Sequence, residues 1–279
     1  MVISIISVLM AIAVPALNAV RSRADALLAM RNQRETTNAL NLYSMDHDDR
    51  YPPSIATVGF DESWRWYDPT KLIGTRKRTP RVHRAMSAYL GPYITDAETV
   101  FCPSAPKPYT FLQEAWEAGD EWDNPQTPVP SDPVTGTFCF YWNYVGWLGE
   151  NRLFYGPAGP AAGGRQSTLL MTDYFGYGNW RSYDGLGDAG FTSCEKLPGG
   201  TVLPEHHQHA ALWAAAGDPE QSLPEVRLRA AFVDGHVETY TPDEAVPMRV
   251  GLEPDGAPPY TDGYTSPGTF YIPEHALPY

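Results

Sequence analysis

The first twenty residues constrain the fold of this chain more than any other segment. Met1 to Val20 contain sixteen apolar side chains, no charged residue and one proline, Pro15. The hydrocarbon core of a bilayer needs about 20 apolar residues in a helix, and this segment reaches that length. The sequence therefore predicts a membrane-spanning helix that ends at Arg21 and Arg23.

Two other interpretations of this segment stay open. A secretory signal peptide has a basic first region, a shorter apolar region and a cleavage site between small residues. No basic region stands before this apolar run, and the small residues Ala11 and Ala13 are followed at once by Val14 and Pro15, which suits cleavage poorly. A buried core helix would show polar residues at helical spacing. We prefer the membrane span to both.

The charges that flank the apolar run give a contradictory orientation. Lys and Arg near a span favour the cytoplasmic side, and Arg21, Arg23, Arg31 and Arg34 all follow the run. Yet the rest of the chain has little lysine and many aromatic residues, including 17 Tyr and 8 Trp, which is typical of proteins outside the cytoplasm. We expect basic residues upstream of Met1, where they would restore the usual orientation.

The composition indicates an acidic, loop-rich and ordered protein. Its formal net charge of −13 argues against a nucleic-acid partner, because such partners require basic surfaces. The 27 Pro and 24 Gly accompany many aromatic residues, a combination that favours a folded domain with long loops. The cysteines Cys102, Cys139 and Cys194 permit one disulfide in three alternative pairings, and no CxxC spacing supports a thiolate metal site.

The helix is predicted to continue beyond the apolar run. Apolar residues in 21–48 recur at three- and four-residue steps as one stripe: Ala24, Leu27, Leu28, Ala39, Leu42 and Met45. The middle of this segment, 31–38, is mostly polar and is expected to face solvent or polar neighbours. Because Pro52 and Pro53 cannot continue a helix, we expect one helix of about 45 residues, about 68 Å long.

This helix and several later motifs resemble a known family. Pro15 falls where the arm of type IV pilins and type II secretion pseudopilins has its kink proline, and NALNLYSMDHDDRYPP (38–53) resembles their helix-to-head junction. Further similar motifs are VFCPSA (100–105), FYWNYVGWLG (140–149), STLLMTDY (167–174) and AAFVDGHVETY (230–240). Together they are similar to pilin-like proteins with a prepilin-type N-terminal methylation domain and an H-x9-DG C-terminal domain.

Two features depart from the family pattern. The family's basic leader, Gly-Phe cleavage point and early Glu are not found in this sequence. We expect them upstream of Met1; the alternative is a copy that is not processed in the usual way. In addition, the His expected ten residues before Asp234 would stand at 224, which is Pro224, and the nearest candidate is His209, with an apparent insertion between them.

The resemblance implies an α+β, pilin-like fold, in which a long N-terminal helix packs against an antiparallel sheet in a loop-rich head. Residues 1–20 would be the transmembrane and filament-core half of the helix, 21–48 its amphipathic half, and 49–279 a globular β-rich head. Pro15 and Cys102 are expected to have structural roles.

The residues themselves predict a β-hairpin near the C-terminus. Residues 226–240 alternate on both sides of a two-residue turn, Asp234-Gly235, which would pair Phe232 with Val237. In that register, Leu228 and Phe232 share a buried face and Arg229 is exposed. Segments 137–148 and 167–172 are further strand candidates, whereas 117–136 and the tail after 242 are expected to be surface loops.

Two groups of side chains suggest metal sites. His207, His209, Asp234 and His236, with the adjacent His206, are of the types that bind zinc, although no HExxH spacing is present. The simpler interpretation, which we prefer, makes Asp234 and Gly235 turn residues and the histidines surface residues. SYDGLGDAG (182–190) and SDPVTG (131–136) have the composition of calcium loops, as some pseudopilin heads do, but neither matches an EF-hand and ordinary turns are preferred.

No catalytic motif is found: the chain has no G-x-S-x-G elbow and no P-loop. Several tryptophans could form a sugar-binding platform, but packing in the core or between subunits is preferred: Trp64, Trp66, Trp142, Trp147 and Trp180.

The resemblance implies a non-enzymatic subunit of a type II secretion or type IV pilus-type filament. The subunit would be a single-pass inner-membrane protein before assembly, with its head in the periplasm or on the cell surface. Its partners would be other filament subunits and the assembly machinery, with no cofactor beyond a structural calcium or zinc ion. The alternative is a membrane-tethered extracytoplasmic carbohydrate-binding protein or metal-dependent hydrolase.

Overall fold

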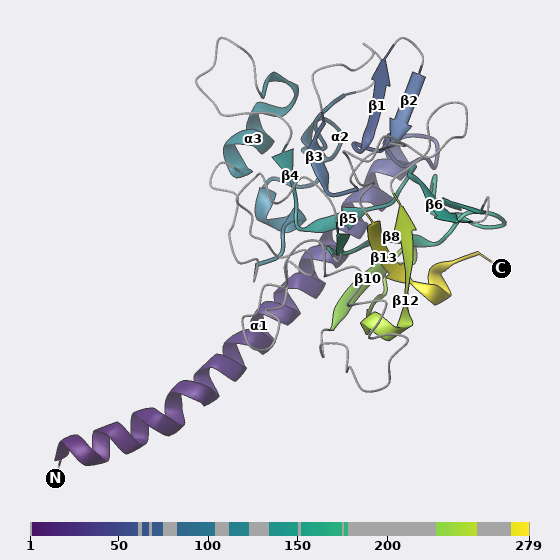
Figure 1. Ribbon diagram of the computed structural model, residues 1–279. Coiled ribbons are helices and arrows are strands. Elements are labelled where there is room, and N and C mark those ends of the chain that lie inside the picture. Colours follow the sequence, from purple (N-terminus) through teal and green to yellow (C-terminus); the bar gives the residue numbers. More distant parts are fainter. Residues whose placement is uncertain are drawn as a thin grey trace.

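The computed structural model of the chain shows one long helix that projects from a β-rich head (Figure 1). The residues that the structure describes are 2–60, 63–66, 69–74, 83–103, 112–122, 134–149, 152–174, 176–177, 227–249 and 269–278.

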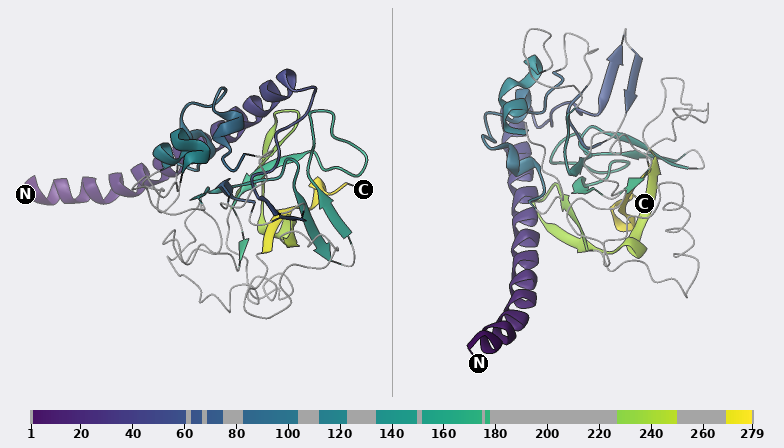
Figure 2. Two further views of the ribbon diagram at one scale, coloured as in Figure 1. Left: turned by 90° about the horizontal axis from the view of Figure 1, so that it is seen from above. Right: turned by 60° about the vertical axis from the view of Figure 1, so that its left-hand side comes forward.

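The long helix, α1, spans Val2–Asp46, so the prediction of one continuous helix of 45 residues is confirmed. Pro15 lies inside it. Because proline has no N–H, one backbone hydrogen bond is missing there, which permits a bend. The N-terminal end of α1 turns away from the axis of the rest of the helix (Figures 1 and 2).

Two antiparallel sheets form the larger part of the head. The first has the order β11 (Val237–Tyr240), β10 (Leu228–Phe232), β8 (Leu169–Asp173) and β5 (Phe138–Phe140). The second has the order β7 (Arg152–Tyr155), β6 (Val145–Gly149), β12 (Ala245–Arg249), β13 (Thr269–Pro273) and β9 (Gly176–Tyr177). A long helix with antiparallel sheets is an α+β fold, as predicted.

Smaller elements complete the described head. Two strand pairs are β1 (Thr57–Phe60) with β2 (Ser63–Trp66), and β3 (Lys71–Ile73) with β4 (Val134–Thr135). The short helices are α2 (Ser87–Leu90), η1 (Ala97–Val100), α3 (Leu112–Ala118), η2 (Gly119–Glu121), η5 (Pro242–Glu244) and η6 (Glu274–Ala276).

The four-stranded sheet has two buried faces because it lies between α1 and the five-stranded sheet. Ala231 of β10 belongs to the same apolar cluster as Leu40 of α1. Phe232, the next residue, belongs to a second cluster with Met248 of β12 and Phe270 of β13. The C-terminal half of α1 therefore runs along one face of the head, and the N-terminal half extends beyond it (Figure 2).

The face of α1 that packs against the head differs from the predicted apolar stripe. The buried residues of α1 are Ala29, Gln33, Thr36, Thr37, Ala39, Leu40, Tyr43 and Ser44. Of the predicted stripe, only Ala39 is buried, whereas Leu42 and Met45 are 50% and 77% exposed. The polar middle of the helix thus contacts the head as Leu40 and Tyr43 do, and the groups opposite this middle part are polar, which is one of the two predicted alternatives.

The hairpin forms, but the predicted register is wrong by one residue. Ala231, not Phe232, pairs with Val237. The loop has three residues, 233–235, and the Phe232 N–H donates to the His236 carbonyl across 3.1 Å. Gly235 takes a φ of +86°, which residues other than glycine rarely adopt. A type I turn followed by such a glycine is the usual three-residue hairpin loop, so the Asp-Gly pair did not select a two-residue turn.

The prediction that Arg229 is exposed is also wrong. Its side chain is 3% exposed, and every residue of β10 is buried. Successive side chains of a strand point to opposite faces of the sheet, so a strand that is covered on both faces buries all of them. Charged residues are tolerated in such a strand only when they are paired.

The prediction that the tail after residue 242 is surface loop is wrong for part of it. Strands β12 and β13 place Met248, Phe270 and Ile272 in the core. Trp122, in the other segment expected to be a loop, is fully buried. Both segments contain isolated apolar residues that pack inward although proline and glycine dominate around them.

Candidate functional site

The projecting half of α1 carries the largest exposed apolar surface of the described chain. We call residues 2–28 the arm. Its exposed large apolar side chains are Ile3, Ile5, Ile6, Leu9, Met10, Ile12, Val14, Leu17, Val20, Leu27 and Leu28. α1 is the one described helix that is long and apolar enough to cross a membrane. Its most apolar stretch is not buried within the chain, which contradicts the interpretation as a core helix.

One contact between α1 and the head is made to a buried ion pair of the four-stranded sheet. Asp173 at the end of β8 accepts hydrogen bonds from the Arg229 guanidinium at 2.9 Å and from the Arg229 N–H at 3.1 Å. The other carboxylate oxygen accepts a bond from the Gln33 amide at 3.0 Å. All three side chains are buried. Helix and sheet are therefore joined through one carboxylate in a low-dielectric site, where hydrogen bonds are directional and strong.

Further hydrogen bonds continue this contact along α1. Asn32 donates to the carbonyls of Glu98 and Phe101 at 2.8 and 3.0 Å. Asn41 donates to the Val233 carbonyl at 3.3 Å, and its own side-chain oxygen accepts a bond from the Tyr51 hydroxyl at 2.7 Å. Burial raises the pKa of Tyr51, so this hydroxyl keeps its proton and remains a donor. The helix is thus held in one register against the head.

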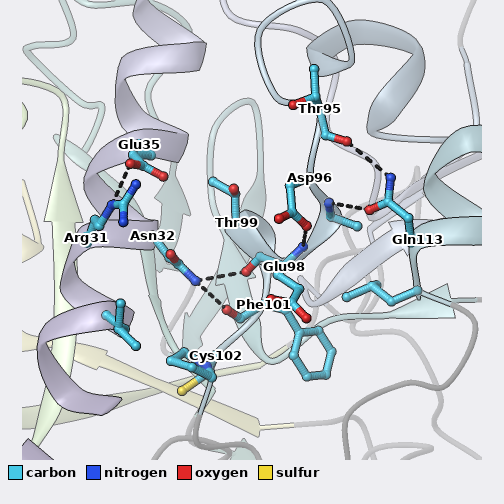
Figure 3. A pocket seen from close by; sticks show the side chains of 14 residues that line it. Arg31, Asn32, Glu35, Thr95, Asp96, Glu98, Thr99, Phe101, Cys102 and Gln113 are labelled. Atoms are coloured by element: carbon cyan, nitrogen blue, oxygen red, sulfur yellow. Dashed lines mark hydrogen bonds and ion pairs between the residues drawn. The ribbon is translucent and has the colours of Figure 1, made fainter. Parts of the chain in front are cut away.

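A groove lies where the arm leaves the head (Figure 3). We call it the neck groove. Its volume is about 870 Å³, and α1 forms one wall with Leu28, Arg31, Asn32 and Glu35. The facing wall is the segment 95–103, with Leu112 and Gln113 of α3. The lining combines charged side chains from both walls with apolar ones such as Leu28 and Phe101, which suits a ligand or chain segment with both kinds of surface.

The facing wall of the groove is fixed by its own hydrogen bonds. The Asp96 carboxylate accepts a bond from the Glu98 N–H at 2.9 Å and so caps η1. Gln113 of α3 accepts a bond from the Ala97 N–H at 2.9 Å and donates to the Thr95 carbonyl at 3.2 Å. These contacts are visible in Figure 3. The wall is therefore pre-formed rather than dependent on a ligand.

The predicted metal residues are only partly within the described chain. His207 and His209, with His206, lie outside the described residues. Asp234 and His236 lie together in the hairpin loop, where the Asp234 carboxylate accepts a bond from the His236 N–H at 3.1 Å and contacts the imidazole at 2.5 Å. Burial raises the pKa of Asp234, but these bonds outweigh it, so the pKa is lowered overall. Asp234 has the predicted turn role.

No group of three metal-binding side chains lies together within the described ranges. Of the two proposed calcium loops, 182–190 lies outside the described residues, and only 134–136 of the other is described. Those three residues belong to β4 and the position after it.

A cluster on the surface near the hairpin was not expected from the sequence. His275 of η6 contacts the Glu238 carboxylate of β11, and the other oxygen of that carboxylate lies 3.9 Å from the His236 imidazole. Phe232 stacks on His236 with a centroid separation of 4.4 Å. The hairpin and the C-terminal segment are joined here. Because His236 and His275 are 39 residues apart, no sequence spacing indicated the contact.

A second unexpected cluster surrounds Asp120. Its carboxylate accepts bonds from the N–H groups of Arg84 and Ala85, each at 2.8 Å, and contacts the His83 imidazole. Burial raises the pKa of Asp120, but the bonds from these three residues outweigh it and the pKa is lowered overall. This carboxylate holds the segment before α2 against η2.

The cysteines have separate environments. Cys102, at the neck groove, is disulfide-bonded, and Cys139 of β5 is a buried thiol outside any disulfide. Of the proposed sugar platform, Trp142 is buried in the core and cannot present its ring to a ligand.

Comparison with known proteins gave no match: no family model, no curated protein and no solved structure matches this chain. The resemblance to pilin-like proteins rests on the quoted motifs and stays a prediction.

Proposed function

We propose that this chain is a non-enzymatic, pilin- or pseudopilin-like subunit of a type II secretion or type IV pilus-type filament. Before assembly, the arm holds the subunit in the inner membrane as a single span with the head on the periplasmic side. On assembly, the arm exchanges lipid for the arms of other copies. Both surroundings are apolar, so the exchange costs little and side-chain packing decides the outcome.

One observation carries this proposal: apolar exposure on α1 continues beyond the length that a membrane needs. Leu42 and Met45 are exposed beside the head. Leu42 lies about 33 Å beyond Val20, at a rise of 1.5 Å per residue. An anchor has no use for exposed apolar side chains that far from the bilayer. A helix that packs against copies of itself along its whole length does.

Two further features support the proposal. The head contacts α1 through a face on which half of the buried residues are polar, and most large apolar side chains of the helix are exposed and available for other contacts. The disulfide of Cys102 fits an oxidising compartment such as the periplasm. Pro15 lies within the apolar arm, where a local bend would help neighbouring arms to pack.

An arm exchange tests the proposal against the alternative of a tethered binding protein or hydrolase. Residues 2–20 of the full chain are replaced by an unrelated transmembrane helix of equal length. We expect the protein to remain in the inner-membrane fraction and to disappear from sheared or cross-linked filaments. A chain that keeps its cellular role after the exchange would be a tethered protein, and the filament proposal would be wrong.

A further inference from the structure

The neck groove carries an excess of negative charge. Three carboxylates, Glu35, Asp96 and Glu98, line it together with one guanidinium, that of Arg31. Arg31 and Glu35 neutralise each other across 2.7 Å on the α1 wall. Asp96 caps η1, and within the described residues the Glu98 carboxylate has no hydrogen bond or ion pair. The facing wall therefore presents two uncompensated carboxylates to any partner (Figure 3).

The arm carries the complementary charge. Arg21 and Arg23 follow the apolar run directly, and both are exposed. No ion pair involves either guanidinium within the described part of the chain, and Asp25 is the one acidic residue of the arm. At the membrane surface, lipid phosphates can balance these guanidinium groups. A subunit that leaves the bilayer loses those phosphates and needs another source of negative charge.

From these two observations we infer that the neck groove of one copy receives the Arg23 side chain of a second copy. The inference rests on the proposed filament function and names a contact within it. Glu98 and Asp96 pair with the incoming guanidinium group, and Leu28 on the α1 wall contacts its aliphatic stem. Arginine side chains present both an apolar stem and a charged end, which matches the two kinds of surface in the groove.

The inference fixes the relative position of the two copies. Arg23 lies 8 to 12 residues before Arg31 and Glu35, which face the groove. Two parallel copies that make this contact are therefore offset along the helix axis by about 12–18 Å at 1.5 Å per residue. The second copy is the one displaced away from the membrane. Such an offset is a head-to-tail contact, which extends to a filament rather than closing as a dimer.

Charge exchange tests the contact in the full chain. Glu98→Lys is expected to reduce the number of filaments about tenfold or more, because like charges then oppose each other across a contact. Arg23→Glu should have a similar effect, and the double variant Glu98→Lys with Arg23→Glu should restore assembly. Asp243→Lys, a reversal of an exposed carboxylate on η5, is the matched control and should assemble as the unaltered protein does.

A cross-link locates the contact directly. Arg23→Lys places an amine that a carbodiimide can join to a carboxylate within ion-pair distance. We expect covalent oligomers with a Lys–Glu98 amide in filaments, and their loss when Glu98→Gln is added. Two results together would overturn this inference alone: normal filament formation by Glu98→Lys, and no Lys–Glu98 amide in the filaments of Arg23→Lys. Unaltered chains that never assemble would overturn the proposed function and the inference together.

Discussion

The Asp173 carboxylate and the Arg229 guanidinium form an ion pair of 2.9 Å that is inaccessible to solvent at both ends. The Gln33 amide donates to the same carboxylate, so one acidic side chain connects β8, β10 and α1. Buried charges are costly unless they are paired and hydrogen-bonded, and removal of one partner leaves the other uncompensated.

Asp173→Ala should therefore destabilise the full chain by about 3–5 kcal/mol, because the Arg229 charge then stays buried without its partner. The free energy of unfolding in urea, measured on detergent-solubilised protein, checks this value. The double variant Asp173→Leu with Arg229→Met should recover much of the loss, since an apolar pair of similar volume carries no charge to bury. A double variant as unstable as Asp173→Ala would contradict this account.

Leu40 and Leu42 give a matched pair on opposite faces of α1. Leu40→Ala should cost about 2–5 kcal/mol in the free energy of unfolding, because Leu40 is fully buried against the head. Leu42→Ala should change it by less than about 0.5 kcal/mol, because half of that side chain is exposed. Thermal unfolding of the unassembled subunits distinguishes the two. For filament assembly we expect Leu42→Ala to be harmful: it weakens assembly although the subunit itself stays stable.

Substitution by alanine should destabilise the chain more at Gly235 than at Gly163, although both glycines have open space around them. Neither Gly235 nor Gly163 has any atom within 4 Å of an added Cβ, but only Gly235 has a positive φ. Gly235→Ala should thus cost about 1–2 kcal/mol from backbone conformation alone. Gly163→Ala should be neutral or slightly stabilising. Equal effects of the two substitutions in chemical unfolding would show that the hairpin loop tolerates other conformations.

The Asp120 cluster should make stability depend on pH in the acid range. The pKa of Asp120 is lowered from 3.8 in the folded chain, so its contribution is present above that pH and is lost as the pH falls through the folded pKa. Asp120→Asn should destabilise the chain by about 1 kcal/mol at pH 7, because its bonds to Arg84 and Ala85 lose their charged acceptor. The difference from the unaltered protein should shrink below about pH 3.8, and a difference that is constant from pH 7 to pH 2.5 would contradict this assignment.

The length of α1 and the α+β class could be predicted because they depend on local patterns: a long run that contains only Pro15 as a helix breaker before Pro52, and alternation around an Asp-Gly pair. The face of α1 that is buried could not. It is selected by partners such as Asp173 and the Glu98 carbonyl, which lie 140 and 66 residues away from Gln33 and Asn32. Apolar spacing instead pointed to Leu42 and Met45, which the head leaves exposed.

The hairpin register and the acidic groove could not be predicted for the same reason: both depend on contacts between distant segments. Two- and three-residue loops both accept Asp234-Gly235, and the choice between them depends on how β10 fits between β8 and β11. The groove brings together residues 28–35 and 95–113, and no motif in either segment indicates the other. Its charge becomes visible only when both walls are placed.

The way in which α1 is fastened to the sheet has a mechanical consequence. Apolar surfaces slide past each other at little cost, whereas the bonds from Gln33, Asn32 and Asn41 each require one alignment of donor and acceptor. A force applied along the helix would therefore be transmitted to the sheet without slippage. Any machine that pushes or pulls on the helix moves the head with it as one body.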